Sequence, residues 1–136
     1  MYLNIRGIKS KIRSLNNIVE EVQPTIICVT ETHLLDEEDI QIDGYKSLRN
    51  DRNKDGGGVL VAVQEKLYNI TTIVEKVKDI EESIWVVINN TRVAIRIGLI
   101  YAPQESRTSK EEYETMYENI SKQITIAQKK RNKSYC

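Results

Sequence analysis

Ile26-Ile27-Cys28-Val29-Thr30-Glu31-Thr32-His33-Leu34 is the stretch that decides the fold of this chain. Its apolar, mostly β-branched half stops at the carboxylate of Glu31. A buried strand with a charged group at its carboxyl end is typical of open α/β sheets, which place their ligand sites there. A carboxylate on a rigid strand end can serve as an oxygen ligand for a hard cation such as Mg²⁺. The alternative is an exposed glutamate that begins a loop.

The residues before this strand predict a β-α-β unit. Met1 to Ile5 is short and apolar, and we expect a strand there. Apolar residues then recur at spacings of three and four, which forms one face of an amphipathic helix; they are Ile8, Ile12, Leu15, Ile18, Val19 and Val22. Pro24 ends the helix, and a strand over 25–30 follows. The two strands are therefore expected to pair in parallel.

Three glycines mark the next informative segment. Gly56-Gly57-Gly58 precedes Val59 to Val63, which we expect to be a buried strand. Glycines at this point suit a turn or bulge with positive φ. A phosphate-binding loop is the alternative, although neither a helix start nor Lys-Ser/Thr follows. Upstream, the acidic run Asp36 to Asp39 is expected in a solvated loop without a metal role, and Gly44 to Leu48 is expected to form a short strand.

Two apolar runs predict an antiparallel pair. Ser83 to Ile88 and Arg92 to Ile100 flank Asn89-Asn90-Thr91, which is expected to be a tight turn. Residues alternate in the second run, so one face should be buried and one solvated. The expected buried residues are Val93, Ile95 and Ile97, and the expected solvated ones are Arg92, Ala94 and Arg96. Trp85 is expected to fill the core, with base stacking as the alternative.

The last segment predicts a helix. Ser109-Lys110-Glu111-Glu112 is a capping box, in which Ser109 caps the helix and Glu112 reaches back. An apolar stripe follows, expected in the core: Tyr113, Met116, Tyr117, Ile120, Ile124 and Ala127. The basic run Lys129 to Lys133 is expected to be a solvated tail, with nucleic-acid contact as the alternative. A β-α-β unit, an antiparallel meander and a helix, in this order, predict an α+β layered fold.

Composition narrows the function classes. The chain has 136 residues, 40% of them hydrophobic and 29% charged, which is typical of a globular protein and excludes a disordered one. Twenty basic residues balance twenty acidic ones, so any polyanion site must be a local patch. Cys28 lies inside an apolar strand and Cys136 ends the sequence, so no disulfide scaffold is expected. Without a signal segment or an apolar run of membrane length, we expect an intracellular protein, the nucleus included, and no membrane partner.

Four motifs in order carry a family resemblance. They are Asn4-Ile5-Arg6-Gly7-Ile8, Thr30-Glu31-Thr32-His33-Leu34, Gly57-Gly58-Val59 and Tyr101-Ala102-Pro103-Gln104. Together they resemble the endonuclease/exonuclease/phosphatase family, and most closely the endonuclease domains of non-LTR retrotransposons. The resemblance implies an α/β (α+β) fold of four layers, an α-β-β-α sandwich, of which residues 1–136 would form a single incomplete domain.

The resemblance also implies a reaction and a set of site residues. Such enzymes hydrolyse phosphoesters with a divalent cation, usually Mg²⁺ and alternatively Mn²⁺, and the endonucleases act on DNA. Glu31 would be the metal ligand, with Asn4 beside it at the cation or the phosphate. Tyr101 would donate a hydrogen bond to a phosphate oxygen, and Gln104 and Arg6 would contact the substrate. A carboxylate suits the cation, while Asn and Tyr donate hydrogen bonds without adding charge that repels phosphate.

The sequence departs from the family in what it lacks. Complete members carry a Gly-Asp-x-Asn motif and a terminal Ser-Asp-His motif, and neither is present. His33, the one histidine, belongs to the Glu31 motif and does not replace the terminal histidine. It is expected to be a partly exposed loop residue, with nucleic-acid contact as the alternative. When several catalytic groups that act as a unit are missing, nearly all catalysis is lost. We therefore expect this chain alone to be inactive. Unpaired strand edges and an exposed apolar face would also make it marginally stable.

The sequence therefore favours the amino-terminal portion of a Mg²⁺-dependent DNA-nicking endonuclease of retrotransposon origin, whose intact form would leave a 3′-hydroxyl. Two alternatives stay open at this point. One is a non-catalytic interaction module whose exposed sheet pairs with a partner. The other is a phosphatase or phospholipase branch of the same family.

Overall fold

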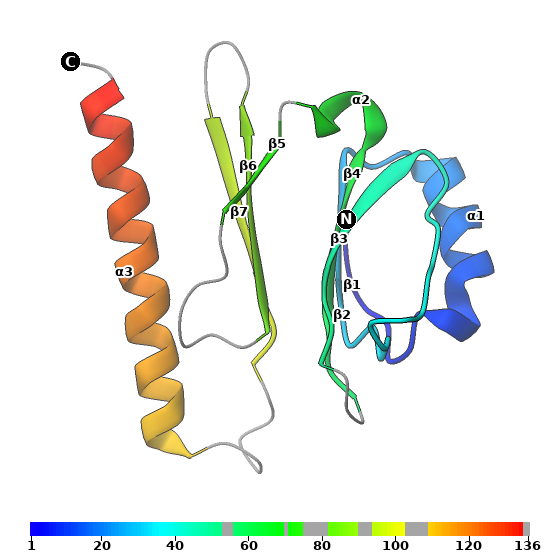
Figure 1. The fold of residues 1–136 in the computed structure, drawn as a ribbon, viewed down its shortest axis with the longest axis horizontal. Coiled ribbons are helices and arrows are strands. Elements are labelled where there is room, and N and C mark those ends of the chain that lie inside the picture. The colour runs from blue at the N-terminus through cyan, green and yellow to red at the C-terminus, as the bar shows by residue number, and fades with distance from the viewer. Residues whose placement is uncertain (53–55, 70, 75–81, 90–93, 103–108, 135–136) are drawn as a thin grey trace.

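A computed structural model describes residues 1–52, 56–69, 71–74, 82–89, 94–102 and 109–134. Two sheets stand face to face, with one long helix outside each of them, so the molecule has four layers in the order α-β-β-α (Figure 1). The elements are β1 (Tyr2–Asn4), a 3₁₀ turn (Lys9–Lys11), α1 (Ile12–Val22), β2 (Ile26–Thr30), β3 (Tyr45–Asn50), β4 (Val59–Gln64), α2 (Glu65–Tyr68), β5 (Thr71–Val74), β6 (Ser83–Asn89), β7 (Ala94–Ile100) and α3 (Lys110–Ser134). The expected sandwich fold is thus confirmed.

The first sheet has the strand order β1-β2-β4-β3. β1 and β2 run in parallel as predicted, with Asn4 opposite Thr30, and α1 connects them. β4 is antiparallel to both of its neighbours and begins at Val59, which lies opposite Thr30 and Asn50. The carboxyl ends of β1, β2 and β3 and the start of β4 therefore meet at one edge.

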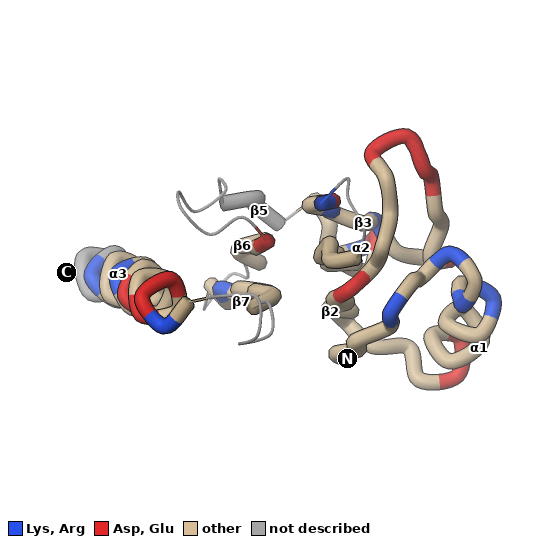
Figure 2. The backbone as a smooth tube through the Cα atoms, turned by 90° about the horizontal axis from the view of Figure 1, so that it is seen from below, with Lys and Arg blue, Asp and Glu red and all other residues tan. Residues whose placement is uncertain are grey.

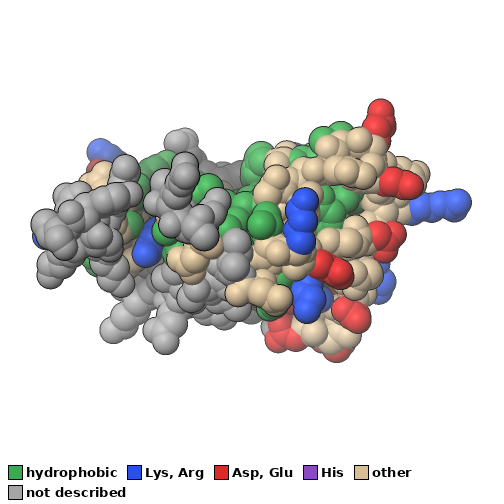
Figure 3. All heavy atoms as spheres, turned by 90° about the horizontal axis from the view of Figure 1, so that it is seen from above, with side chains coloured by type: hydrophobic (Ala, Val, Ile, Leu, Met, Phe, Trp, Pro, Cys, Tyr) green, Lys and Arg blue, Asp and Glu red, His purple; other side chains and the backbone are tan. Residues whose placement is uncertain are grey.

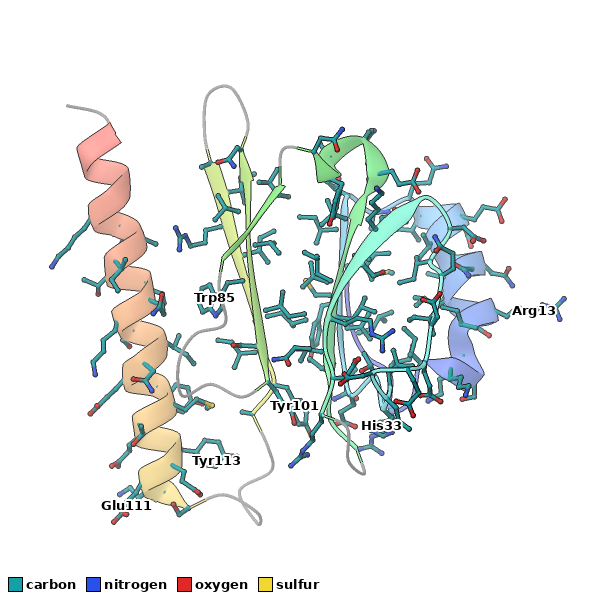
Figure 4. All side chains as sticks on the ribbon, viewed as in Figure 1. Arg13, His33, Trp85, Tyr101, Glu111 and Tyr113 are labelled. Atoms are coloured by element: carbon teal, nitrogen blue, oxygen red, sulfur yellow. The ribbon has the colours of Figure 1, made fainter. Side chains whose placement is uncertain are left out.

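The second sheet has the order β5-β6-β7, and both pairings are antiparallel. Ser83 at the start of β6 lies opposite Ile100 at the end of β7. The chain leaves β7 there and continues into Tyr101 at the same end of the sandwich as His33 (Figure 4). The predicted pairing of the two runs is confirmed for residues 83–89 and 94–100, while 90–93, which include part of the predicted turn and the predicted start of the second strand, lie outside the described residues.

The hydrophobic core is centred on β4, whose first five residues are all apolar. Val59 to Val63 are all fully buried, as expected for a strand covered on both faces. Leu60 and Ala62 pack with α1 residues such as Leu15 and Val19. The alternate residues of β4 pack against the second sheet; this inter-sheet cluster comprises Val59, Val61, Val63, Ile84, Val86 and Leu99.

Trp85 is buried as predicted, but it lies on the outer face of the second sheet. Its side chain points toward α3 (Figure 4) and packs with Ile100 and Ile120. Opposite it, Gly98 leaves room for the ring, since a Cβ there would lie 2.6 Å from a ring carbon. The face of β7 expected to be solvated is therefore partly covered by this helix.

Local signals in the sequence correctly place several helix ends. Gln23 adopts the left-handed conformation and its N–H donates to Val19 O, so α1 ends at Val22, two residues before Pro24. At the start of α3, the Ser109 N–H donates to Glu112 Oε2 at 2.7 Å, and the Glu112 N–H donates to Ser109 Oγ at 3.2 Å. The predicted capping box is confirmed.

On α1 and α3, the predicted apolar stripe includes residues that the helix does not bury. In α1, Ile18 and Val22 are exposed, because the helix buries only the narrow strip around Leu15 and Val19. In α3, Tyr117 is 61% exposed and Ile124 is also exposed, so placing them in the core was wrong. Both lie about 40–60° around the helix from Ile120, to the same side of the strip that faces the sheet.

Two further expectations are corrected. Ile95 was expected on the buried face of β7 but is 53% exposed, because the inter-sheet cluster reaches only Ile97 along this strand. The basic run from Lys129 was expected to be a tail, yet α3 continues helically to Ser134. The elements α2 and β5 were not predicted, because Glu65–Tyr68 is a single helical turn and Thr71–Val74 is a very short strand.

Acidic and basic residues both occur along the described part of the chain. The acidic run Asp36 to Asp39 lies in the loop between β2 and β3, as predicted, and forms the long red arc in Figure 2. Most described charged side chains visible in Figure 3 stand on the half of the molecule that contains the first sheet. Among the described residues, no helix is both long and apolar enough to cross a membrane.

Candidate active site

Three predicted site residues meet at one carboxylate oxygen. Asn4 ends β1, Glu31 directly follows β2, and Tyr101 directly follows β7. Asn4 Nδ2 donates a hydrogen bond of 3.0 Å to Glu31 Oε1, and the Tyr101 hydroxyl donates one of 3.1 Å to the same atom. The parallel pairing of β1 with β2 brings Asn4 to Glu31, whereas Tyr101 arrives from the other sheet.

Two cationic or ionisable groups approach the second oxygen of this carboxylate. Arg6 Nε lies 3.8 Å from Glu31 Oε2, and His33 Nε2 lies 3.9 Å from it. The Arg6 side chain is largely exposed and His33 is 37% exposed, so both are accessible to a ligand at this edge. His33 is a partly exposed loop residue, as predicted, and its ring lies beside the Glu31 carboxylate.

The backbone around Glu31 is in a conformation that side chains disfavour. Arg6, Glu31 and His33 have φ values of 47°, 56° and 54°. A left-handed residue other than glycine costs about 1–2 kcal/mol, and such residues cluster at functional sites. Packing of neighbouring segments must hold this geometry.

The neighbouring segment is the glycine turn. Gly57 O accepts the His33 N–H at 2.9 Å, and Gly58 O accepts the Thr32 N–H at 3.3 Å. A Cβ on Gly58 would lie 2.4 Å from Thr32 Oγ1, and both glycines have positive φ. The predicted turn is thereby confirmed. Because the Gly58 N–H points at the carboxylate of Glu82, this amide does not form part of a phosphate-binding loop.

Hydrogen bonding and burial together set the protonation states of Glu31 and Tyr101. The hydrogen bond from Asn4 is the largest factor that lowers the pKa of Glu31, and Tyr101, Arg6 and His33 add to it while burial opposes them. Burial raises the pKa of Tyr101, and its hydrogen bond to Glu31 raises it further. Near neutral pH, Glu31 is therefore an anion and Tyr101 a neutral donor.

The donor set fits Mg²⁺ held with few protein ligands. The Glu31 side chain is 18% exposed, so its anionic oxygens are accessible from one side. The Asn4 amide oxygen is not used in the bond to Glu31 and is a second hard oxygen donor at the site. Mg²⁺ is commonly bound by one or two protein oxygens together with water and phosphate. Within the described ranges, no group of three or more Asp, Glu, His or Cys side chains could form an all-protein cage.

Two residues at this edge were not predicted from the sequence. Glu82 is buried in front of β6, and Arg52 Nε lies 3.1 Å from its Oε1. No sequence signal marks them, because they meet only when the two sheets stack. Of the predicted residues, Asn4, Arg6, Glu31 and Tyr101 are brought together, and Gln104 lies outside the described residues.

A separate hollow of about 700 Å³ lies away from this site. It is lined by polar residues of α1 and by the opposite ends of β3 and β4, including Gln23, Gly44 and Gln64. Because β3 and β4 place Glu31 at their other end, this hollow does not belong to the candidate site.

No protein-family profile and no curated protein sequence match the chain. Solved structures do match its fold. An AP endonuclease from Archaeoglobus fulgidus aligns with a TM-score of 0.65 at 22% identity, covering 88% of this chain and 48% of that one. A 3′ phosphatase from Neisseria, bound to a product DNA hairpin, gives a TM-score of 0.68 at 12% identity, covering 91% and 51%.

A third match extends the pattern. An AP endonuclease from Leishmania major aligns with a TM-score of 0.63 at 17% identity, covering 76% of this chain and 40% of that one. The chain thus has the fold of endonuclease/exonuclease/phosphatase enzymes and spans about half the length of the structures it matches.

Proposed function

We propose that this chain, which has the fold of endonuclease/exonuclease/phosphatase enzymes, is the amino-terminal portion of a Mg²⁺-dependent endonuclease domain of retrotransposon origin that acts on DNA. The observation that carries the proposal is the convergence of Asn4 and Tyr101 on Glu31 Oε1 from two different sheets. The retrotransposon origin rests on the order and wording of the four sequence motifs alone.

The proposed roles follow from the chemistry of the side chains. Glu31, an anion held by two donors, and the oxygen of Asn4 would hold Mg²⁺, or Mn²⁺ in its place. The cation would offset negative charge on the phosphate oxygens. Tyr101 remains protonated and can donate to a phosphate oxygen in place of Glu31. Arg6, exposed beside the carboxylate, and Gln104 would bind the DNA backbone.

We further propose that residues 1–136 bind the cation but do not cleave DNA on their own, as part of a single incomplete domain. The sequence contains neither Gly-Asp-x-Asn nor Ser-Asp-His, so it lacks the aspartate and the His–Asp pair that the resemblance implies for activating the nucleophile and binding the phosphate. Removing several cooperating catalytic groups leaves little beyond binding.

Metal binding is the direct test. We expect Mn²⁺, followed by its paramagnetic effect on water relaxation, to bind the purified chain and to be displaced by Mg²⁺. Glu31→Gln should abolish binding, because it removes the charge and one of the anionic oxygens. Glu38→Gln is the matched control, since Glu38 is also paired with a cation, Lys9, but lies outside the site. Equal binding by wild type and Glu31→Gln would contradict the proposal.

Supercoiled plasmid with Mg²⁺ tests the inactivity. We expect no nicking above background from the chain alone. Nicking that Glu31→Gln abolishes would show that the site is correctly assigned and that the chain is already sufficient for catalysis.

A phosphomonoesterase is the second candidate, and one comparison favours it: the matched Neisseria protein is a 3′ phosphatase. A DNA oligonucleotide with a 3′-phosphate distinguishes the two. Release of phosphate without plasmid nicking would support the phosphatase branch over the endonuclease. The third option, a non-catalytic interaction module, would be supported by a chain that self-associates and binds no Mn²⁺.

A further inference from the structure

Glu82 occupies the point where the two sheets meet beside the candidate site. It immediately precedes β6, its side chain is 10% exposed, and its carboxylate crosses to the first sheet. There Oε2 accepts the Gly58 N–H in a long hydrogen bond of 3.4 Å, and Oε1 pairs with Arg52 Nε at 3.1 Å. A carboxylate buried to this degree needs such partners, since an unpaired charge in the interior is strongly disfavoured.

The backbone of the same residue holds Tyr101. Glu82 O accepts the Tyr101 N–H at 3.0 Å, which fixes the residue that follows β7. The Tyr101 hydroxyl then donates to Glu31 Oε1 at 3.1 Å. One residue therefore contacts both the glycine turn of the first sheet and the tyrosine of the second.

These contacts form a closed circuit in which hydrogen bonds alternate with short segments of the chain. From Glu31 the circuit passes through the Thr32 N–H to Gly58 O, and from the Gly58 N–H to the Glu82 carboxylate. It continues from Glu82 O to the Tyr101 N–H, and the tyrosine hydroxyl returns it to Glu31. Glu31 has a left-handed backbone that is unfavourable by itself, so its position depends on such external bonds.

Gly57 is the residue that makes room for this arrangement. A Cβ at this position would lie 2.6 Å from Glu82 Oε1 and 2.6 Å from Arg52 Cδ. Its φ of 72° is also one that side chains disfavour. The glycine turn therefore leaves room for the Glu82 side chain and also accepts hydrogen bonds from the Thr32–His33 segment.

We infer that Glu82 is a positioning residue for Glu31 and Tyr101: it ties the two sheets together at the end where these residues share a hydrogen bond. The consequence for cation binding rests on the proposed function, whereas the consequence for the Glu31–Tyr101 contact does not. Partners that orient metal ligands are typically worth roughly 10- to 100-fold in metal affinity.

Two substitutions test the inference at different severity. Glu82→Gln keeps the size of the side chain but has one acceptor oxygen for two donors, Gly58 N–H and Arg52. Glu82→Ala removes both acceptors. Glu38→Gln and Glu38→Ala are matched controls, because the Glu38 carboxylate also accepts a backbone N–H, that of Leu35 at 3.0 Å, and pairs with Lys9.

The first measurement is the ¹³C chemical shift of the Tyr101 ring at pH 7 without metal, assigned with Tyr101→Phe. Glu31→Ala gives the reference for a tyrosine without its carboxylate partner. We expect Glu82→Gln to move the resonance part of the way to this reference and Glu82→Ala most of the way, while both Glu38 variants leave it in place. An unchanged resonance in folded Glu82→Gln would overturn the inference.

The second measurement is Mn²⁺ affinity, which should fall about 10- to 100-fold in Glu82→Ala and less in Glu82→Gln. If Glu82→Ala does not fold, Glu82→Gln decides the question alone. Unfolding of both variants would overturn the inference in favour of a purely structural role. If the wild-type chain binds no Mn²⁺, the proposed function fails, while the Tyr101 resonance still decides the role of Glu82.

Discussion

Tyr101 and Glu31 are 70 residues apart in the chain, yet the phenol donates a 3.1 Å hydrogen bond to Glu31 Oε1. Glu31 belongs to the edge of the first sheet and Tyr101 to that of the second. This bond therefore reports directly on how the sheets are stacked. Its presence places a neutral hydrogen-bond donor and a carboxylate anion within one site.

Tyr101→Phe should destabilise the chain by about 1–2 kcal/mol at pH 7, because a hydrogen bond to a largely buried carboxylate is lost. Urea unfolding measures the change. Tyr117→Phe, which alters an exposed tyrosine of α3, should leave the free energy of unfolding within about 0.5 kcal/mol. Equal effects of the two substitutions would mean that the Tyr101–Glu31 bond does not contribute to stability.

The effect of Asn4→Ala should depend on pH. The Asn4 hydrogen bond is the largest factor that holds the pKa of Glu31 below its ordinary value of 4.5. A carboxylate whose pKa is lower in the folded state stabilises the fold above its unfolded pKa, and this contribution disappears as the pH falls through the folded pKa. Asn4→Ala should thus destabilise the chain at pH 7, and its difference from wild type should shrink on acidification below the ordinary pKa.

Denaturant unfolding across this pH range checks the prediction. Asn17→Ala, on the exposed side of α1, is the control, and its difference from wild type should not vary with pH. A pH-independent effect of Asn4→Ala would show that the pKa of Glu31 does not depend on this bond.

Gly58→Ala should be far more damaging than Gly44→Ala. Both glycines have positive φ, 88° and 83°, so the backbone penalty of about 1–2 kcal/mol is common to the two substitutions. A Cβ on Gly44 meets nothing within 4 Å, whereas one on Gly58 lies 2.4 Å from Thr32 Oγ1. The difference between the two free energies of unfolding isolates the clash.

A second substitution identifies the clashing atom. Thr32→Ala removes the hydroxyl and should recover part of the stability that Gly58→Ala loses, because the two changes couple. Additive effects of the two substitutions would place the damage elsewhere.

Gly98→Ala should disturb the packing of Trp85. A Cβ at this position would lie 2.6 Å from the indole ring, which α3 covers through Ile120. We expect a loss of about 1–3 kcal/mol, typical of overpacking, and a red shift of Trp85 fluorescence as the ring moves outward. An unchanged emission spectrum would indicate that the ring is not confined between Gly98 and α3.

Local patterns account for the part of the fold that was predicted. The capping box at Ser109 and Glu112 and the end of α1 before Pro24 depend on residues within one helical turn, so the sequence shows them directly. The valine-rich run of β4 likewise predicts burial on both faces. The stripes on α1 and α3 were overestimated, because periodicity shows which residues share a face but not how much of that face a neighbour covers.

The candidate site likewise contains residues that were predicted from the sequence and residues that were not. Glu31 was predicted from the end of the apolar strand, whereas Asn4 was placed beside it by resemblance; the predicted parallel pairing of β1 with β2 is what brings the two strand ends together. The place of Tyr101 was suggested only by resemblance, and the contact between His33 and Glu31 became evident only in the structure. Arg52 and Glu82 gave no sequence signal.

By itself, the sequence determined the described strands other than β5, the two longer helices and the carboxylate at the end of β2, since these depend on residues that are neighbours along the chain. Only the tertiary structure decided that Glu82 spans the two sheets, that Tyr101 donates to Glu31 and that Trp85 faces α3. The physical reason is that stacking of the two sheets brings together groups tens of residues apart. Their contacts depend on how the side chains between the sheets pack. The hydrophobic periodicity of a single strand does not show how the two sheets align.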